Sequence, residues 1–345
     1  MLVKSRSRKI DVALALVTRA WNDLCRTNGL EARALPTVVT ALKPHRDARK
    51  SGVYRLAGVG EGGASVIAKR CVPETARLER DVYERVLPAI GMPALRCYGC
   101  LGEADGEFSW LFLQDAGDGK LLDSDQDLAA AWLARLHADA ATLVDVVPLP
   151  QRGAEHYREH LEFAMMILDE LRTHRGAAGD QDAVALRALK QGMRTLETSW
   201  SAIATTCASS PRSLVHGDFV AKNIRRIATP TSDGIVALDW ETAGWGPIAA
   251  DLPQWIPRPP RKPHKPQRWS GTVGLDVYAA HARGAWDGRR RQDLERLAAV
   301  GTILRCVTGI RWGLEQVRAG GTVKSMERLR WFAEELPHAI AAVGC

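Results

Sequence analysis

Leu214-Val-His-Gly-Asp-Phe-Val-Ala-Lys-Asn223 is the most informative segment of this 345-residue sequence. It brings a histidine, a carboxylate (Asp218) and an amide (Asn223) onto one short stretch. Asp218 and Asn223 are five positions apart, which is natural on a tight loop and too far for contact along an extended strand. We expect such a loop to turn the carboxylate towards a substrate and the amide towards a metal ion.

The residues that follow are predicted to form a β-hairpin. Ile224–Ile227 and Ile235–Leu238 are the two arms, and Thr229-Pro-Thr-Ser-Asp-Gly234 between them is rich in turn residues. A hairpin returns the chain to its starting point, so Asp239 should lie beside Asn223. Oxygen ligands from two strands suit a hard cation such as Mg²⁺.

These side chains are the set that phosphoryl transfer from ATP requires. One Asp orients the attacking hydroxyl, while an Asn and a second Asp hold Mg²⁺ on the phosphates. His216-Gly-Asp218 alone is compatible with an ordinary turn. Its combination with Asn223, a hairpin and Asp239 favours the catalytic interpretation.

The same residues resemble the aminoglycoside phosphotransferase and choline kinase superfamily, whose members have a protein-kinase-like fold. His216-Gly-Asp218 stands where protein kinases have His-Arg-Asp, and Asp239-Trp-Glu241 stands where they have Asp-Phe-Gly. Gly246 and Asp251-Leu252 match the Gly and the Asp-Leu that follow in the family. The resemblance extends from about Val38 to the C-terminal helices. It identifies a type of reaction much better than it identifies an acceptor.

The resemblance implies an α+β, two-lobe fold with a small β-rich N-terminal lobe and a larger helical C-terminal lobe. We assign residues 1–116, with a helix at 9–28, to the nucleotide-binding lobe, and residues 117–345 to the lobe for catalysis and acceptor binding. The order of predicted elements agrees: a helix with the apolar face Ile10, Leu14, Val17, Trp21 and Leu24, strands at 37–42, 53–59 and 64–70, a helix at 73–87, and a strand at 110–113.

The resemblance also implies roles for the central residues. Asp218 is the expected catalytic residue, and His216 is expected to support its loop. Asn223 and Asp239 are the expected Mg²⁺ ligands, and ATP is the expected phosphoryl donor.

Lys69 lies on the third predicted strand, where the family has a lysine that contacts the α- and β-phosphates. Glu79 in the next helix is its expected ion-pair partner, and Glu84 is the competing one.

The segment expected to cover the nucleotide departs from the protein-kinase pattern. The segment His45–Gly52 contains a single glycine and no G-x-G-x-x-G pattern. Ser51 and Gly52 are therefore the candidates for backbone N–H contacts to phosphate. The backbone around Gln114 and Ala116, in the expected inter-lobe linker, is the candidate for contact with the adenine edge.

The acceptor is expected to bind in the C-terminal region, with Glu241, Trp245 and Asp251 as candidate contacts. Residues 241–345 contain sixteen Lys and Arg against ten Asp and Glu. A polycation would be repelled by a basic surface, and tryptophans can stack on sugars. We therefore expect a neutral or anionic hydroxylated acceptor, such as a sugar, an antibiotic-like natural product or a small metabolite. The alternative is an aminoglycoside- or choline-type kinase with a local acidic pocket.

Composition bears on the cellular location of the protein and on whether it contains disulfides or a zinc site. The first nine residues are basic and are not followed by an apolar segment, and no apolar run reaches the length of a membrane span, so a cytoplasmic location without membrane association is expected. Seven cysteines do not suggest a disulfide framework, and Cys97-Tyr-Gly-Cys100 lacks the partners of a zinc site. His137, in a predicted helix, is expected to be buried and hydrogen-bonded.

Two other classes remain as alternatives. A catalytically silent nucleotide-binding protein is suggested by the degenerate phosphate loop alone. A nucleic-acid-binding protein is suggested by the pI of about 9.1 and the basic, proline-rich run Arg258–Arg268. No aromatic-interleaved basic motif accompanies that run, so we expect no nucleic-acid partner.

Overall fold

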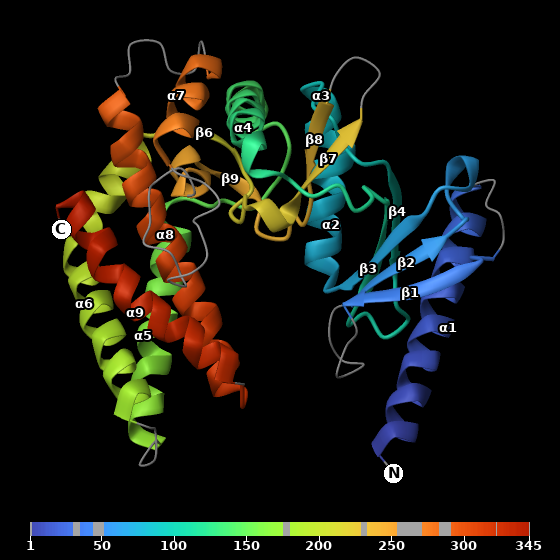
Figure 1. Cartoon of the computed structure of the whole chain (residues 1–345), viewed down its shortest axis with the longest axis horizontal. Coiled ribbons are helices and arrows are strands. Elements are labelled where there is room, and N and C mark those ends of the chain that lie inside the picture. Colours follow the sequence, from blue (N-terminus) through green and yellow to red (C-terminus); the bar gives the residue numbers. More distant parts are fainter. Residues whose placement is uncertain are drawn as a thin grey trace. The chain divides into compact units, whose positions relative to one another are not determined.

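The computed structural model describes residues 2–29, 35–43, 52–174, 180–228, 233–253, 271–282, 291–321 and 323–344 (Figure 1). The chain divides into an N-terminal unit, Met1–Leu121 with Ala221–Glu241, and a C-terminal unit, Leu122–Val220 with Thr242–Cys345. Ala221–Glu241 therefore belongs to the N-terminal unit, whereas the sequence analysis assigned it to the C-terminal lobe.

The N-terminal unit is built on a five-stranded sheet in the order β1-β2-β3-β5-β4, with every pair antiparallel. The sheet and the mostly helical region after it confirm the predicted α+β, kinase-like class. The bounds are β1 (Val38–Lys43), β2 (Gly52–Ala57), β3 (Val66–Cys71), β4 (Cys97–Gly102) and β5 (Ser109–Gln114), with helices α1 (Leu2–Asn28), α2 (Pro73–Asp81) and α3 (Leu87–Ala89).

Side-chain alternation gives this sheet two different faces. The register pairs Ala68 with Phe112 and Lys69 with Leu111, so each pair points to its own face. Helix α1 covers the Phe112 face, where Trp21 is buried with its ring 5.3 Å from that of Phe112. Helix α2 packs on the face that carries Lys69 (Figure 1). The strand register thus directs Lys69 towards α2.

The predicted hairpin is confirmed as β7 (Ile224–Ala228) paired antiparallel with β8 (Asp233–Ala237). The N–H of Arg226 donates to the carbonyl of Gly119 at 2.9 Å. A Cβ at Gly119 would lie 2.6 Å from the Arg226 carbonyl oxygen, so this contact requires glycine. The close approach explains why the hairpin packs with the N-terminal unit.

The C-terminal unit is mostly helical, and its core surrounds α8. Helix α8 is long and apolar enough to cross a membrane, but 72% of its apolar window is buried inside the protein, as in the core helix of a globular unit. The helices are α4 (Gln126–Ala140), α5 (Ala154–His174), α6 (Asp180–Ser209), α7 (Gly271–His281), α8 (Arg291–Arg318) and α9 (Val323–Val343).

A small antiparallel sheet of β6 (Arg212–Val215) and β9 (Gly244–Pro247) carries the loops that matter for function. After β9, a 3-10 turn at Ile248–Asp251 packs closely on α8, because a Cβ at Gly301 would lie 1.8 Å from the carbonyl oxygen of Ala249. This packing fixes the turn that presents Asp251 to the loop after β6.

Candidate functional site

In the N-terminal unit, one ammonium group is surrounded by three carboxylates. The Nζ of Lys69 on β3 donates to Oε1 of Glu79 on α2 at 2.5 Å and also to Oδ1 of Asp239. It lies 3.6 Å from Oε2 of Glu241. The expected Lys69–Glu79 pair is thus formed. The competing Glu84 is instead half-exposed and lies near Arg80.

The β7–β8 hairpin brings the two predicted metal ligands to one place. Asn223 ends a 3-10 turn before β7, and its carbonyl accepts the N–H of Leu238 at 2.7 Å. Asp239 is the next residue, and its φ of 66° is unusual for a residue other than glycine. Such a backbone conformation costs about 1 kcal/mol or more and is concentrated at functional sites. The hairpin therefore places Asp239 one residue from the backbone partner of Asn223, as the sequence predicted.

Charge in this cluster is unbalanced. Among the described residues, three carboxylates share one ammonium group. Although burial opposes it, the surrounding carboxylates Glu79, Asp239 and Glu241 raise the pKa of Lys69 well above its usual value. Burial raises the pKa of Glu79 to about 7, against the opposing effect of Lys69. In the described part of the chain, the buried Oε2 of Glu79 has no hydrogen-bond partner. A hard, oxygen-seeking cation beside Asp239 would balance this charge, so the donor set fits Mg²⁺.

In the C-terminal unit, the carboxylate of Asp251 binds the backbone of the loop after β6. Oδ2 of Asp251 accepts the N–H of His216 at 2.6 Å, and Oδ1 accepts the N–H of Gly217 at 2.8 Å. Gly217 has φ of 76°, and a Cβ there would lie 2.9 Å from the carbonyl oxygen of Thr242. The glycine of the His-Gly-Asp motif is thus required by both its conformation and its neighbours. The N–H of Asp218 donates to Nδ1 of His216 at 3.3 Å, consistent with a supporting role for His216.

Asp251 does not have the role that the sequence suggested. Its side chain is fully buried, and its two oxygens hold the backbone of the catalytic loop, so it is a loop-holding group and not an acceptor contact. His137 is buried as expected, with Nε2 3.3 Å from Oδ2 of Asp251 and Nδ1 2.8 Å from the hydroxyl of Tyr278. Sequence reasoning missed Tyr278, because no motif marks it and it lies on a distant helix.

Trp245 is also corrected from an acceptor contact to a core residue. It is 1% exposed, and its indole N–H donates to the carbonyl of Val147 at 2.7 Å. Trp240 is likewise fully buried, with its indole N–H donating to the carbonyl of Ala237. Glu241 is half-exposed and belongs to the Lys69 cluster. Three other tryptophans of the C-terminal region lie outside the described residues: Trp255, Trp269 and Trp286.

The expected nucleotide contacts receive uneven support. Ser51 lies outside the described residues, as does the basic run Arg258–Arg268, while Gly52 begins β2 opposite Arg70. The N–H of Gln114 is engaged by the carbonyl of Arg96 at 2.8 Å. In the described structure the N–H of Ala116 has no protein acceptor. Of the two linker candidates, Ala116 therefore retains a donor for an adenine edge.

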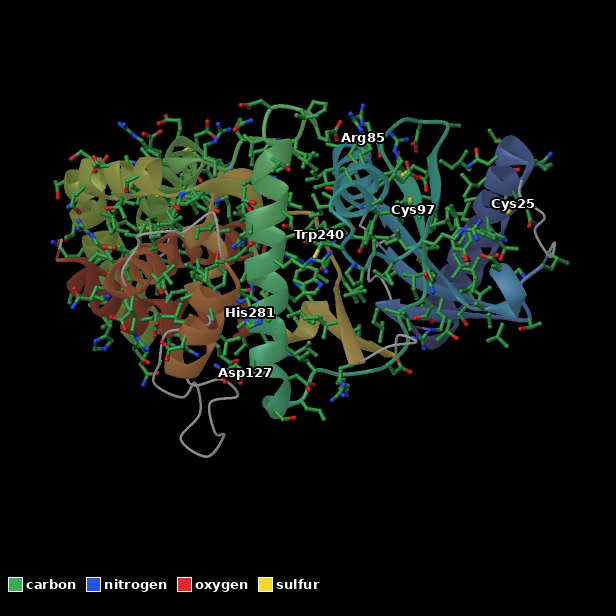
Figure 2. All side chains as sticks on the ribbon, turned by 90° about the horizontal axis from the view of Figure 1, so that it is seen from above. Cys25, Arg85, Cys97, Asp127, Trp240 and His281 are labelled. Carbon is green, nitrogen blue, oxygen red and sulfur yellow. The ribbon has the colours of Figure 1, made fainter. Side chains whose placement is uncertain are left out.

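The Cys97–Cys100 pair lies on β4, on the face that α2 covers (Figure 2). Burial raises the pKa of Cys100 to about 12 and also raises that of Cys97. No group of three His, Cys, Asp or Glu side chains within the described ranges could hold a metal ion. The interpretation of the pair as structural stays a prediction.

Comparison with known proteins decides the family. Residues 42–256 match the phosphotransferase enzyme family. This chain belongs to that family. Among curated protein sequences, none matches it significantly.

Solved structures of other phosphotransferases share the fold. Plasmodium vivax ethanolamine kinase is 16% identical with a TM-score of 0.59, covering 92% of this chain and 87% of that chain. Macrolide 2'-phosphotransferase MphH from Brachybacterium faecium is 16% identical with a TM-score of 0.53, covering 91% and 97%. A thermostable mutant of aminoglycoside phosphotransferase APH(4)-Ia, in ternary complex with AMP-PNP and hygromycin B, is 12% identical with a TM-score of 0.52, covering 92% and 97%.

The buried carboxyl of Glu79 predicts a pH effect on the stability of this phosphotransferase. Because its pKa rises from 4.5 to about 7 in the folded state, the folded chain binds this proton more tightly than the unfolded chain. The resulting stabilisation is fully present below pH 4.5 and is lost as the pH rises through about 7. Glu79→Gln should remove that loss, so its urea midpoint should fall less between these pH values than that of the wild type.

Glu84→Gln, on the same helical segment but half-exposed, is the matched control and should follow the wild type. A Glu79→Gln midpoint that falls with pH as steeply as the wild-type midpoint would contradict the assignment.

Proposed function

We propose that this protein is an ATP- and Mg²⁺-dependent phosphotransferase that moves the γ-phosphoryl group to a hydroxyl of a small molecule. The observation that carries the proposal is the Lys69 cluster, in which a β-strand lysine is paired with a helix glutamate and with Asp239 after the hairpin. Phosphoryl transfer of the kinase type uses the same three groups. We also propose a cytoplasmic location, where both cofactors are abundant.

Within the N-terminal unit, Lys69 would neutralise phosphate charge and Glu79 would keep its ammonium in place. Asn223 and Asp239 would hold Mg²⁺, which supplies positive charge to the phosphate oxygens. When the phosphates bind, Asp239 would exchange its contact with Lys69 for the cation. The excess of carboxylates in the cluster supports this exchange, because one ammonium does not balance three of them.

Within the C-terminal unit, Asp218 would accept a hydrogen bond from the acceptor hydroxyl and orient its oxygen towards the γ-phosphorus. The hydroxyl oxygen forms the new P–O bond as the bond to the β-phosphate oxygen breaks. The hydroxyl proton passes to Asp218 late, since the transition state is loose and demands little basicity. Asp251 and Gly217 fix the loop so that Asp218 does not have to be ordered during the reaction.

The relatives support the reaction class and differ in their acceptors. One homologous structure contains AMP-PNP with hygromycin B, and others are an ethanolamine kinase and a macrolide 2'-phosphotransferase. Identities of 12–16% do not transfer an acceptor to this chain. We propose a neutral or anionic hydroxylated small molecule, because Asp251, a carboxylate considered for acceptor binding, is enclosed and the region as a whole is basic.

Asp218→Ala should lower kcat by roughly a hundredfold or more, because it removes the group that orients and deprotonates the acceptor. The affinity for ATP, measured by calorimetry, should stay close to that of the wild type, because Asp218 acts on the acceptor. Asp139→Ala, at an exposed position on α4 of the same unit, is the control. Wild-type turnover in the Asp218 variant would show that the catalytic residue lies elsewhere.

Asp239→Asn should abolish Mg²⁺-dependent ATP binding, and Asn223→Ala should weaken it, because both side chains are assigned to one ion. Titration of Mg²⁺ at fixed ATP, followed by calorimetry, measures the effect. Asp105→Asn, in an exposed turn of the same unit, should leave the titration unchanged. If the Asp239 variant titrates like the wild type, the metal is held by other residues.

A further inference from the structure

We propose that Arg152, His156, His160 and Arg311 form an anion site in the C-terminal unit, and that this site receives an acidic group, a carboxylate or a phosphate, of the acceptor. That the bound molecule is the phosphoryl acceptor rests on the proposed function. The four side chains come from the segment before α5, from α5 itself and from α8.

Arg152 is a half-buried cation that meets no carboxylate among the residues that the structure describes. Its Nε donates to the carbonyl of Ala243 at 3.1 Å, and its Nη1 lies 3.3 Å from Nε2 of His156. Among the described residues it makes no ion pair, and burial lowers its pKa. An enclosed charge of this kind is costly unless an opposite charge meets it. A guanidinium offers paired N–H donors that match the two oxygens of a carboxylate or phosphate.

Two neutral histidines stand next to this arginine. His156 and His160 are four residues apart on α5, so they share one helix face, and their ring centroids are 4.4 Å apart. Burial, followed by the charges of Arg152 and Arg311, lowers the pKa of His156 to about 4. Burial, with His156 and the same two arginines, lowers the pKa of His160 to about 3. Both rings are therefore neutral at pH 7, and each carries one N–H. Nδ1 of His160 lies 3.3 Å from the hydroxyl of Thr308, which donates its own proton to the carbonyl of Leu304, so the N–H of His160 is used there. His156 is the ring that offers an N–H donor to an anion.

Arg311 extends the positive surroundings from α8. Its guanidinium lies 4.9 Å from the ring centroid of Phe163 on α5, and its Nε lies 3.3 Å from Oε1 of Glu315, one turn along the same helix. Glu315 is thus the one carboxylate in contact with the cluster among the described residues, and it is one-third exposed. No carboxylate contributes to the change in pKa of Arg152, His156 or His160.

The anion site is tied to the catalytic loop through one short segment. The N–H of Arg152 donates to the carbonyl of Trp245 at 2.7 Å. A Cβ at Gly244 would lie 2.3 Å from the carbonyl oxygen of Pro150, so the two backbones are in close contact. Two residues before Gly244, Thr242 donates its hydroxyl to the carbonyl of His216 at 2.7 Å. The segment that anchors Arg152 is therefore the one that contacts the His216–Asp218 loop.

This placement predicts selectivity between acceptors of different charge. A hydroxylated acid could pair its acidic group with Arg152 and the N–H of His156. An acceptor with an ammonium group would meet like charge there, which costs binding energy. The preference for anions that the net positive charge of the C-terminal region suggests is thus assigned to particular side chains.

The test compares binding of probes that share a skeleton and differ in charge. Gluconate, glucose and glucosamine form one set, glycerate and glycerol a second, and inorganic phosphate is the simplest anion. Calorimetry and the histidine Cε1–H resonances report binding without activity. At least one anion should bind the wild type roughly tenfold or more tightly than its neutral or cationic mate, and Arg152→Gln should lose that advantage. Arg158→Gln, an exposed arginine on α5 paired with Glu162, should behave like the wild type.

Arg311→Gln provides a second variant, because its side chain holds no backbone group of the loop. If Arg152→Gln does not fold by circular dichroism, loss of the anion preference in Arg311→Gln supports the site and its retention overturns it. A wild type that binds no anionic probe better than its mate also overturns it. Anion binding that depends on Arg152, in a protein that transfers no phosphoryl group from ATP, would instead remove the proposed function and leave the site standing.

Discussion

In the N-terminal unit, the ammonium group of Lys69 is shared among three carboxylates, and the rest of the unit positions these groups. Lys69 reaches Glu79 because the register of β3 with β5 turns it towards α2. It reaches Asp239 because the hairpin packs against the same unit through Gly119. The strand, the helix and the hairpin must all be in place for the cluster to form. Among the described residues, three carboxylates share one ammonium group, and this is the property that makes the cluster suitable for a metal–nucleotide complex.

Asp239 and Asp251, the two aspartates that follow the hairpin in the family pattern, lie in opposite environments and have different roles. Asp239 sits in a left-handed backbone conformation, partly exposed, and it shares the ammonium group of Lys69 with Glu79 and Glu241. Asp251 is enclosed, and both of its oxygens accept backbone N–H groups of the loop that carries Asp218. The first is arranged to exchange partners and the second to keep them. His137 and Tyr278 extend the fixed network behind Asp251, so the position of Asp218 depends on packing deep in the C-terminal unit.

The sequence predicted those parts of the site that depend on residues close together in the chain or on family motifs. The hairpin between Asn223 and Asp239 and the Lys69–Glu79 pair followed from turn residues, strand alternation and family motifs. Burial was not predictable in this way. Trp245 and Asp251 look like surface candidates in the sequence, and their enclosure results from β9 and the turn after it packing against distant elements. Likewise, His156 and His160 have visible helical spacing, but Arg311 joins them only through the packing of α5 on α8.

The most direct test of the central claim is calorimetry of ATP binding to Lys69→Met, with and without Mg²⁺. Lys190→Met, which removes a lysine paired with Asp169 in the C-terminal unit, is the control. The account predicts that the wild type and the control bind ATP tightly only with Mg²⁺, and that Lys69→Met loses roughly tenfold or more in affinity for the complex. Equal affinity of Lys69→Met and wild type for the Mg²⁺–ATP complex would contradict the claim that this cluster is the nucleotide site.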